Sequence, residues 1–150
     1  MRAIIQRVSH AQVDVEQQTI GRIGSGMLIL VGFESADTDE DLTWLSGKIA
    51  RLRLFDDGHG AMNLSLADIG GQVLVVSQFT LHARTKKGNR PSFVAAAPSA
   101  QALDLYNRFV KTLSAELGQP VQTGQFGANM QVSLLNDGPV TIFIDTQNRE

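Results

Sequence analysis

The stretch Asn136-Asp137-Gly138-Pro139-Val140-Thr141 lies between two apolar runs, Met130–Leu135 and Val140–Ile144. Turn-forming residues between two apolar runs predict a tight turn that joins two buried strands. Glycine adopts backbone angles that other residues avoid, while proline restricts its own φ and lacks an N–H. A Gly-Pro peptide bond also reaches the cis form more readily than other bonds. Two interpretations are open: an ordinary hairpin turn, or a rigid loop that presents its carbonyl groups.

Apolar patterns along the rest of the chain predict both strands and helices. Strands are expected where apolar residues alternate with polar ones or form short runs, at Arg2–Val8, Ala11–Glu16, Met27–Phe33, Gln72–Leu81, Val121–Thr123, Met130–Leu135 and Val140–Asp145. A first amphipathic helix is expected from a capping Thr38 to near Phe55. A second runs from Pro98-Ser99 to Gly118, with an apolar stripe of Leu103, Tyr106, Val110, Leu113 and Leu117. Leu64–Ile69 is ambiguous between strand and helix.

These elements predict one domain over residues 1–150, of the α/β class in its α+β form. The expected sheet is mostly antiparallel or mixed, or a partly closed barrel, with two main helices packed on it. Residues 146–150 are expected to form a frayed tail.

Composition narrows the classes of function. The chain has no cysteine, which excludes disulfides, a thiol nucleophile and cysteine metal sites. Its three histidines lack metal-ligand spacing, and no phosphate-binding glycine motif is present, so neither a metal nor a cofactor is expected. No apolar run approaches the ~20 residues that cross a bilayer. Polar residues follow Ile4-Ile5, which argues against a signal peptide. We expect a soluble, cytoplasmic protein without membrane contact.

The charge pattern restricts any contact with nucleic acid to a local surface. The net charge is −2, whereas proteins that coat nucleic acid are usually basic. One long polar loop, from His82 to about Pro91, gathers four basic residues: Arg84, Lys86, Lys87 and Arg90. Long loops are often functional, and these residues are candidates for RNA contact. A solvated surface loop is the alternative.

The segment Ser77-Gln78-Phe79-Thr80 places polar residues at the end of an apolar strand. Ser77 lacks the glycines of a nucleophile elbow, so a serine hydrolase of that type is not predicted. Hydroxyl, amide and backbone N–H groups fixed at a pocket edge suit an oxyanion hole. A hydrogen-bonded strand end without chemistry is the alternative. His82 is a candidate general base, aligned with Thr80 only if the strand continues unbroken.

Two motifs together resemble those of the D-aminoacyl-tRNA deacylase family: Ser77–Leu81 and Asn136–Thr141. The segments Gly88–Phe93 and Phe126–Met130 are also similar to that family, and the resemblance covers Met1 to about Asp145. It implies a hydrolase that cleaves the ester between a D-amino acid, or glycine, and the terminal adenosine of a tRNA. Such an enzyme spares L-aminoacyl-tRNA and thereby proofreads chirality in translation.

The resemblance also implies roles for particular residues. Ser77, Gln78, Phe79 and Thr80 would surround the ester as the catalytic segment, and Met130 and Phe126 would help bind the substrate. Gly138-Pro139 would be a cis dipeptide inserted from one subunit into the pocket of its partner, where it excludes every L side chain by collision. Arg7 would help hold this wedge. A homodimer with sites completed across the interface follows.

Two mechanisms remain open at this point. In one, Thr80 attacks the ester and needs an activating base, which the sequence does not place securely. In the other, backbone N–H groups near Gln78 to Thr80 hold the oxyanion, and the terminal ribose 2′-OH helps activate water. The second mechanism needs neither a protein nucleophile nor a protein base, and it suffices more readily because an aminoacyl ester is already labile. Two other functions are also open: a non-catalytic RNA-binding or editing-accessory module, and a small-molecule esterase indifferent to RNA.

Overall fold

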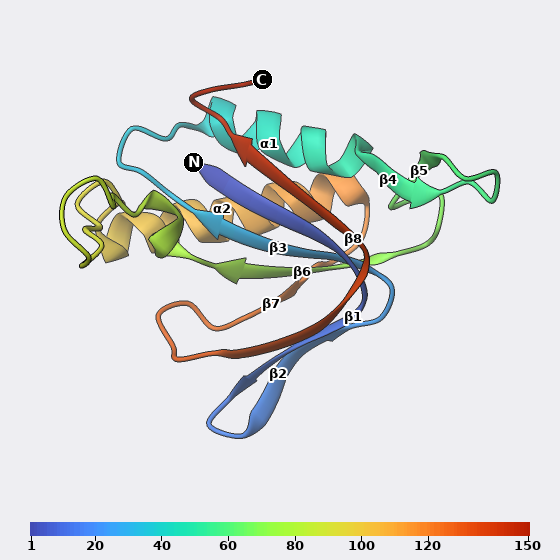
Figure 1. Cartoon of the computed structure of the whole chain (residues 1–150), viewed down its shortest axis with the longest axis horizontal. Helices are drawn as coiled ribbons and strands as arrows, with labels where there is room; N and C mark the ends of the chain where they lie inside the picture. Colours follow the sequence, from blue (N-terminus) through green and yellow to red (C-terminus); the bar gives the residue numbers. More distant parts are fainter.

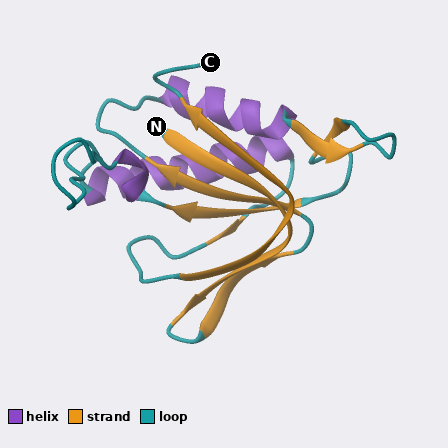
Figure 2. Ribbon diagram, in the orientation of Figure 1, coloured by secondary structure: helices purple, strands orange, loops and turns teal.

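The computed structural model describes residues 1–150, the whole chain. Its elements are β1 (Arg2–Val15), β2 (Gln18–Ile23), β3 (Gly26–Gly32), α1 (Asp39–Arg51), β4 (Arg53–Asp56), β5 (Met62–Ser65), β6 (Gln72–Ser77), the 3-10 turn η1 (Phe79–His82), α2 (Ser99–Leu117), β7 (Gln122–Thr123) and β8 (Gln131–Asp145). The predicted α+β class is confirmed, because α1 and α2 lie side by side against one part of a curved sheet (Figures 1 and 2). Neither helix has the length and hydropathy needed to span a membrane.

The main sheet is mixed, as predicted. Its order is β2-β1-β3-β6-β7, and β8 pairs with β1 outside this path. β1 is antiparallel to β2, β3 and β8, whereas β3–β6 and β6–β7 are parallel pairs. The first part of β1, Arg2–Val8, pairs with β3, and its last part, Ala11–Val15, pairs with β2. Since β8 follows β1 along both parts, the sheet curls into a nearly closed barrel (Figure 1).

The predicted hairpin at Asn136–Thr141 is wrong. Both apolar runs that flank it pair with β1 and not with each other, so they form one long strand, β8. β1 is long enough to offer both runs a partner, which a sequence pattern does not reveal. Between the pairs Val8↔Asn136 and Gln6↔Thr141, β8 carries residues 137–140 opposite the single residue Arg7. The motif is therefore a bulge in a continuous strand.

Two element boundaries also differ from the prediction. The strand expected over Gln72–Leu81 stops at Ser77, because its partner β3 ends at Gly32 and Val31↔Ser77 is the last pair of the ladder. The first helix ends at Arg51 and not near Phe55. The following residues form β4, which pairs with β5 in a short hairpin outside the main sheet.

The second helix is confirmed, but its buried face is shifted. α2 spans Ser99–Leu117, and Gly118 ends it in the left-handed conformation with φ of 65°. Its buried residues are Ala102, Leu105, Tyr106, Phe109 and Leu113. Leu103 of the expected stripe is instead 40% exposed. The small Ala102, which the expected stripe left out, is instead buried against the larger apolar cluster.

Apolar packing divides between two clusters. The larger lies between the sheet and the helices and includes Ile5, Ile29, Leu45 and Phe109. The smaller comprises Val8, Ala11, Val13, Ile23, Leu28, Leu74 and Val76, on β1, β2, β3 and β6. Burying one such side chain contributes about 1.5–3 kcal/mol. The two clusters make both parts of the sheet rigid, and the candidate site lies where they meet.

The C-terminal residues 146–150, expected to fray, contact α1. Thr146 is buried, and its N–H donates to the Met1 carbonyl at 3.0 Å. The Gln147 side-chain amide donates to Asp41 at 3.4 Å, and the Arg149 guanidinium lies 4.5 Å from the ring centre of Trp44. These contacts hold the tail against the first turns of the helix.

Candidate active site

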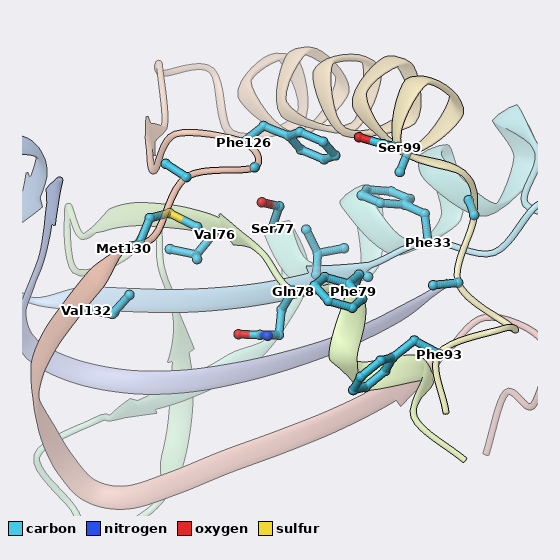
Figure 3. A pocket seen from close by; sticks show the side chains of 17 residues that line it. Phe33, Val76, Ser77, Gln78, Phe79, Phe93, Ser99, Phe126, Met130 and Val132 are labelled. Carbon is cyan, nitrogen blue, oxygen red and sulfur yellow. The ribbon is translucent and has the colours of Figure 1, made fainter. Parts of the chain in front are cut away.

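A cavity of about 560 Å³ opens at the carboxyl ends of the parallel strands β3 and β6. Val31 and Phe33 line it from the β3 side, and α2 contributes Ser99 and Ala102. The segment after β7 supplies a further wall, which includes Phe126. Figure 3 shows Phe33, Phe126 and Ser77 facing one another across the space. Twelve of its 17 lining residues are hydrophobic, which is typical of ligand sites with a few orienting polar groups.

The polar wall of the cavity is the predicted catalytic segment. Ser77, Gln78 and Phe79 all line the cavity, whereas Thr80 does not. The Gln78 side-chain amide joins Thr80 to this wall by donating to its hydroxyl oxygen at 2.5 Å. The chain leaves β6 at Ser77 and enters η1 two residues later. The end of a rigid strand and the first residues of a turn therefore present their polar groups together.

The backbone of this segment has a defined hydrogen-bond pattern. The Gln78 N–H donates to the Val31 carbonyl at 2.7 Å, so it is not free for a ligand. The Leu81 and Ala83 amides close the turn onto the carbonyls of Gln78 and Thr80, at 3.3 and 3.1 Å. The N–H groups of Phe79 and Thr80 lie at the start of the turn, where a helix has no acceptor of its own for them. No acceptor within the chain takes a hydrogen bond from either N–H, so both are available as donors beside the Ser77–Phe79 wall.

His82 does not face this wall. Its imidazole is buried, Nδ1 lies 2.9 Å from the Glu34 carboxylate, and Nε2 has no partner. The strand that would align it with Thr80 ends at Ser77, and His82 is not among the lining residues. The Thr80 hydroxyl accepts a hydrogen bond from Gln78, and no side chain of this chain accepts its proton. Within this chain, no side chain that could act as a base contacts the Thr80 hydroxyl.

Aromatic contacts hold two walls of the cavity. Phe79 and Phe93 meet edge to face, with ring centres 5.1 Å apart. Phe126 lies 5.7 Å from Tyr106, whose hydroxyl donates to the Val75 carbonyl at 3.0 Å. Burial raises the pKa of Tyr106 to about 12, so its hydroxyl stays protonated at neutral pH and serves as a fixed donor. Tyr106 thereby anchors the Phe126 side of the cavity to β6.

The Gly138-Pro139 bulge lies away from the cavity of its own chain. None of residues 136–141 lines the cavity, and in Figure 1 the bend of β8 lies near the start of β3 and β6, whereas the basic loop lies beyond their carboxyl ends. The Gly138–Pro139 bond is cis, and Gly138 has φ of 138°. A Cβ added at Gly138 would lie 2.9 Å from the Val140 nitrogen and 3.1 Å from Arg7 Nη2. Only glycine fits this backbone beside that guanidinium.

Arg7 ties the bulge to the body of the domain. Its Nε donates to the Asp137 carbonyl at 2.8 Å, and its Nη1 donates to the Leu54 carbonyl at 2.6 Å. The side chain is 13% exposed and lies 3.6 Å from the Asp137 carboxylate. One planar guanidinium therefore connects β1, β4 and the bulge.

The basic loop stands beside the cavity mouth. Arg84 and Ser92 exchange two backbone hydrogen bonds, at 2.8 and 3.0 Å, which close the intervening residues into a loop. Phe93 follows directly and lines the cavity. The four basic side chains, Arg84, Lys86, Lys87 and Arg90, are exposed and form no ion pair within the chain.

Of the predicted site residues, the structure gathers Ser77, Gln78, Phe79, Phe126 and Met130 at one cavity. Arg7, Gly138 and Pro139 form a second group at the bulge. Sequence reasoning missed Gly32, Phe33, Ala97 and Ala102 as lining residues. A parallel β3–β6 pair would have indicated the first two, because ligands bind beyond the carboxyl ends of parallel strands. The pairing direction is not visible in the apolar pattern.

The fold places the protein in a class of small, barrel-like α+β domains with a cavity at the carboxyl ends of two parallel strands. Within this class, the family model described as D-Tyr-tRNA(Tyr) deacylase matches residues 4–145. The chain belongs to this family. The resemblance expected from the two motifs is confirmed.

Full-length relatives agree with this assignment. Proteins named D-aminoacyl-tRNA deacylase are 58% identical in Bacteroides thetaiotaomicron and 56% identical in Akkermansia muciniphila, each over 100% of both chains. A solved structure of a c-Myc DNA unwinding element binding protein has a TM-score of 0.90 at 40% identity, covering 97% of this chain and 98% of that one. A probable eukaryotic D-amino acid tRNA deacylase superposes with a TM-score of 0.81 at 21% identity, covering 95% and 97%, which shows a shared fold.

Proposed function

We propose that this protein hydrolyses the ester bond of D-aminoacyl-tRNA and releases the free D-amino acid and tRNA. Its membership of the deacylase family and its full-length relatives of that name support the activity. The observation that carries the proposal is an apolar cavity that ends in the polar Ser77–Phe79 wall and lies beside an exposed basic loop.

The chemistry follows from the donors at the wall. The amides of Phe79 and Thr80 stabilise the negative charge that develops on the ester carbonyl oxygen. Water attacks the carbonyl carbon, the bond to the terminal ribose oxygen breaks, and that oxygen takes up a proton. The ribose 2′-OH assists in activating the water, because the chain offers no base beside Thr80. Absence of a base also argues against a covalent Thr80 intermediate.

We further propose that selectivity for D substrates comes from the bulge of a second subunit. Gly138-Pro139 lies away from its own cavity, so it can act only in a partner's. β8 has a free edge and exposes Leu135 and Phe143, 55% and 59% accessible, which favours its contact with another copy. A backbone wedge at the α-carbon rejects any L side chain by collision, and glycine passes because it has none.

The tRNA body is proposed to lie along the basic loop. Arg84, Lys86, Lys87 and Arg90 form no ion pair within the chain, so their charges are available to phosphates. An overall charge of −2 limits binding to this surface and argues against coating of nucleic acid in general. Such a proofreading enzyme acts in the cytoplasm, where translation occurs.

The test is hydrolysis of one amino acid in its D and L forms, each esterified to the same tRNA, at substoichiometric protein. We expect rapid turnover of the D form and survival of the L form. Equal rates for the two would overturn chiral selection. Binding without turnover would assign a non-catalytic RNA module, and equal hydrolysis of an aminoacyl ester that lacks the tRNA body would assign a small-molecule esterase.

A further inference from the structure

The turn η1 (Phe79–His82) carries the two proposed oxyanion donors, yet it belongs to neither the sheet nor a long helix. Its position therefore depends on side chains and backbone contacts around it. On its N-terminal side the Gln78 N–H bonds to the Val31 carbonyl at 2.7 Å. Its C-terminal side is fixed by a separate set of side chains, those of His82, Glu34 and Arg2, and none of them lines the cavity.

His82 closes the turn with a buried ring. The side chain is 1% exposed, and its Nδ1 lies 2.9 Å from Glu34 Oε1. Because a carboxylate only accepts hydrogen bonds, Nδ1 carries the hydrogen and donates it. This is the only hydrogen bond of the imidazole, since Nε2 has no partner. A single bond to Glu34 thus sets the orientation of the ring.

Glu34 is itself anchored below the turn. Its N–H donates to Asp37 Oδ2 at 2.7 Å. Asp37 is buried and pairs through its other carboxylate oxygen with the Met1 amino group. The backbone of Glu34 is therefore attached to a buried polar network, while its side chain reaches His82. Because the Glu34 backbone is held in place, its side chain can hold His82, and with it the turn, in a fixed position.

Gly32 leaves room for this arrangement. A Cβ at Gly32 would lie 2.6 Å from the Gln78 carbonyl oxygen and 3.1 Å from His82 Cδ2. The end of β3 thus passes in close contact with both ends of the turn, and the imidazole packs between Gly32 and Glu34. A shift of the ring would move the turn relative to β3.

Arg2 supplies a second attachment. Its Nη1 donates to the Leu81 carbonyl at 3.0 Å, and its Nε pairs with Asp145 Oδ2 at 2.9 Å. The side chain holds the backbone of the residue just before His82. Arg2 on β1 and Glu34 in the loop after β3 therefore restrain adjacent residues of the turn, Leu81 and His82.

We propose that Glu34 and His82 are a positioning pair, which with Arg2 sets the orientation of the Phe79 and Thr80 amides toward the reacting carbonyl. This inference rests on the proposed function, because it assigns a purpose to the orientation of those amides. The pair acts through the backbone and does not touch the substrate. A displacement of about 1 Å at a catalytic group can lower a rate by about 10²-fold.

The test compares variants in steady-state hydrolysis of D-aminoacyl-tRNA. Glu34→Ala removes the acceptor and is expected to lower kcat at least tenfold while KM changes less than twofold, because the cavity walls remain. Glu34→Gln keeps an oxygen that accepts from Nδ1, and we expect it to retain wild-type kcat within about threefold. His82→Phe is expected to lower kcat as Glu34→Ala does. The double variant Glu34→Ala with His82→Phe should lower kcat little more than either single variant, because both substitutions break the same hydrogen bond.

A matched control is Glu40→Ala, which removes an exposed carboxylate of α1 and should leave both constants unchanged. Should Glu34→Ala fail to fold, Glu34→Asp, shorter by one methylene, takes its place. Equal activity of Glu34→Ala and wild type would overturn the inference. An equal loss in Glu34→Gln and Glu34→Ala would also overturn it, since charge and not the hydrogen bond would then be responsible.

A readout without substrate separates this inference from the proposed function. The ¹H–¹⁵N resonances of the Phe79 and Thr80 amides should shift in Glu34→Ala and stay near wild type in Glu34→Gln. Wild-type protein that fails to hydrolyse D-aminoacyl-tRNA would refute the proposed function. Unshifted Phe79 and Thr80 amides in folded Glu34→Ala would refute the positioning pair, whatever the activity.

Discussion

Replacing Arg7 by lysine tests how the bulge is held. The guanidinium donates to two carbonyls at once, those of Asp137 and Leu54, at 2.8 and 2.6 Å. The single ammonium of lysine has no planar fork and can satisfy only one of these positions. Arg7→Lys keeps the charge and most of the side-chain volume. It therefore isolates the link between β4 and the bulge.

The expected change in the ratio of D to L hydrolysis follows from the free energy of the lost hydrogen bond. A hydrogen bond to a charged donor contributes about 1.5–3 kcal/mol net. If that free energy holds the bulge in its selective position, its loss lowers the ratio of D to L hydrolysis by about tenfold to 150-fold. The bond to Asp137 is solvent-exposed, so the lower end is expected for that contact. The ratio should fall mainly because L-aminoacyl-tRNA begins to react.

The assay is kcat/KM for matched D- and L-aminoacyl-tRNA, measured for wild type, Arg7→Lys and a control. Arg53→Lys is the control, because Arg53 is exposed on β4 and forms no ion pair. An unchanged D/L ratio in folded Arg7→Lys would refute the role of this guanidinium in selectivity. The same fall in the D/L ratio in Arg53→Lys would show that the effect is not specific to Arg7.

Three further predictions concern the wall, the loop and the sheet. Thr80→Val should lower kcat less than about tenfold, because the backbone donors remain. Thr43→Val, at an exposed position, is the control. Abolished hydrolysis with intact tRNA binding would favour a Thr80 nucleophile. Lys86→Ala and Lys87→Ala should each weaken tRNA binding and reduce the slope of the logarithm of the association constant against log[salt] by about one. Filter binding at several salt concentrations measures this slope. Lys111→Ala, on the exposed side of α2, is the control. At Asp145, burial is the largest single effect and opposes ionisation, but the hydrogen bonds from Arg2 and the Gln147 N–H, with the positive charges of Arg2 and the N-terminus, together outweigh it and hold the pKa below the usual 3.8. A carboxyl whose pKa is lowered on folding stabilises the fold above its unfolded pKa, and this is lost as the pH falls below it. In Asp145→Asn, the free energy of unfolding measured by urea titration should therefore fall less between pH 6 and pH 3 than in wild type. An equal fall in both proteins over this range would contradict the prediction.

The sequence alone determined the class of fold and the segments that matter. Periodicity identified both helices and most strands, because apolar faces repeat with the spacing of the element that buries them. Thr38 with Asp41, and Gly118, marked helix ends, since capping depends on residues close in the chain. The motifs Ser77–Leu81 and Asn136–Thr141 pointed to the family that the comparisons then confirmed.

The tertiary structure alone decided how these segments meet. Asn136–Thr141 has the composition of a hairpin turn, but the long β1 offers both flanking runs a partner, so the motif became a bulge beside Arg7. His82 has the residue type of a general base, but the end of β3 stops the strand and turns the ring inward to Glu34. Strand pairing and side-chain burial depend on residues distant in sequence, and local patterns carry no information about which of them come together.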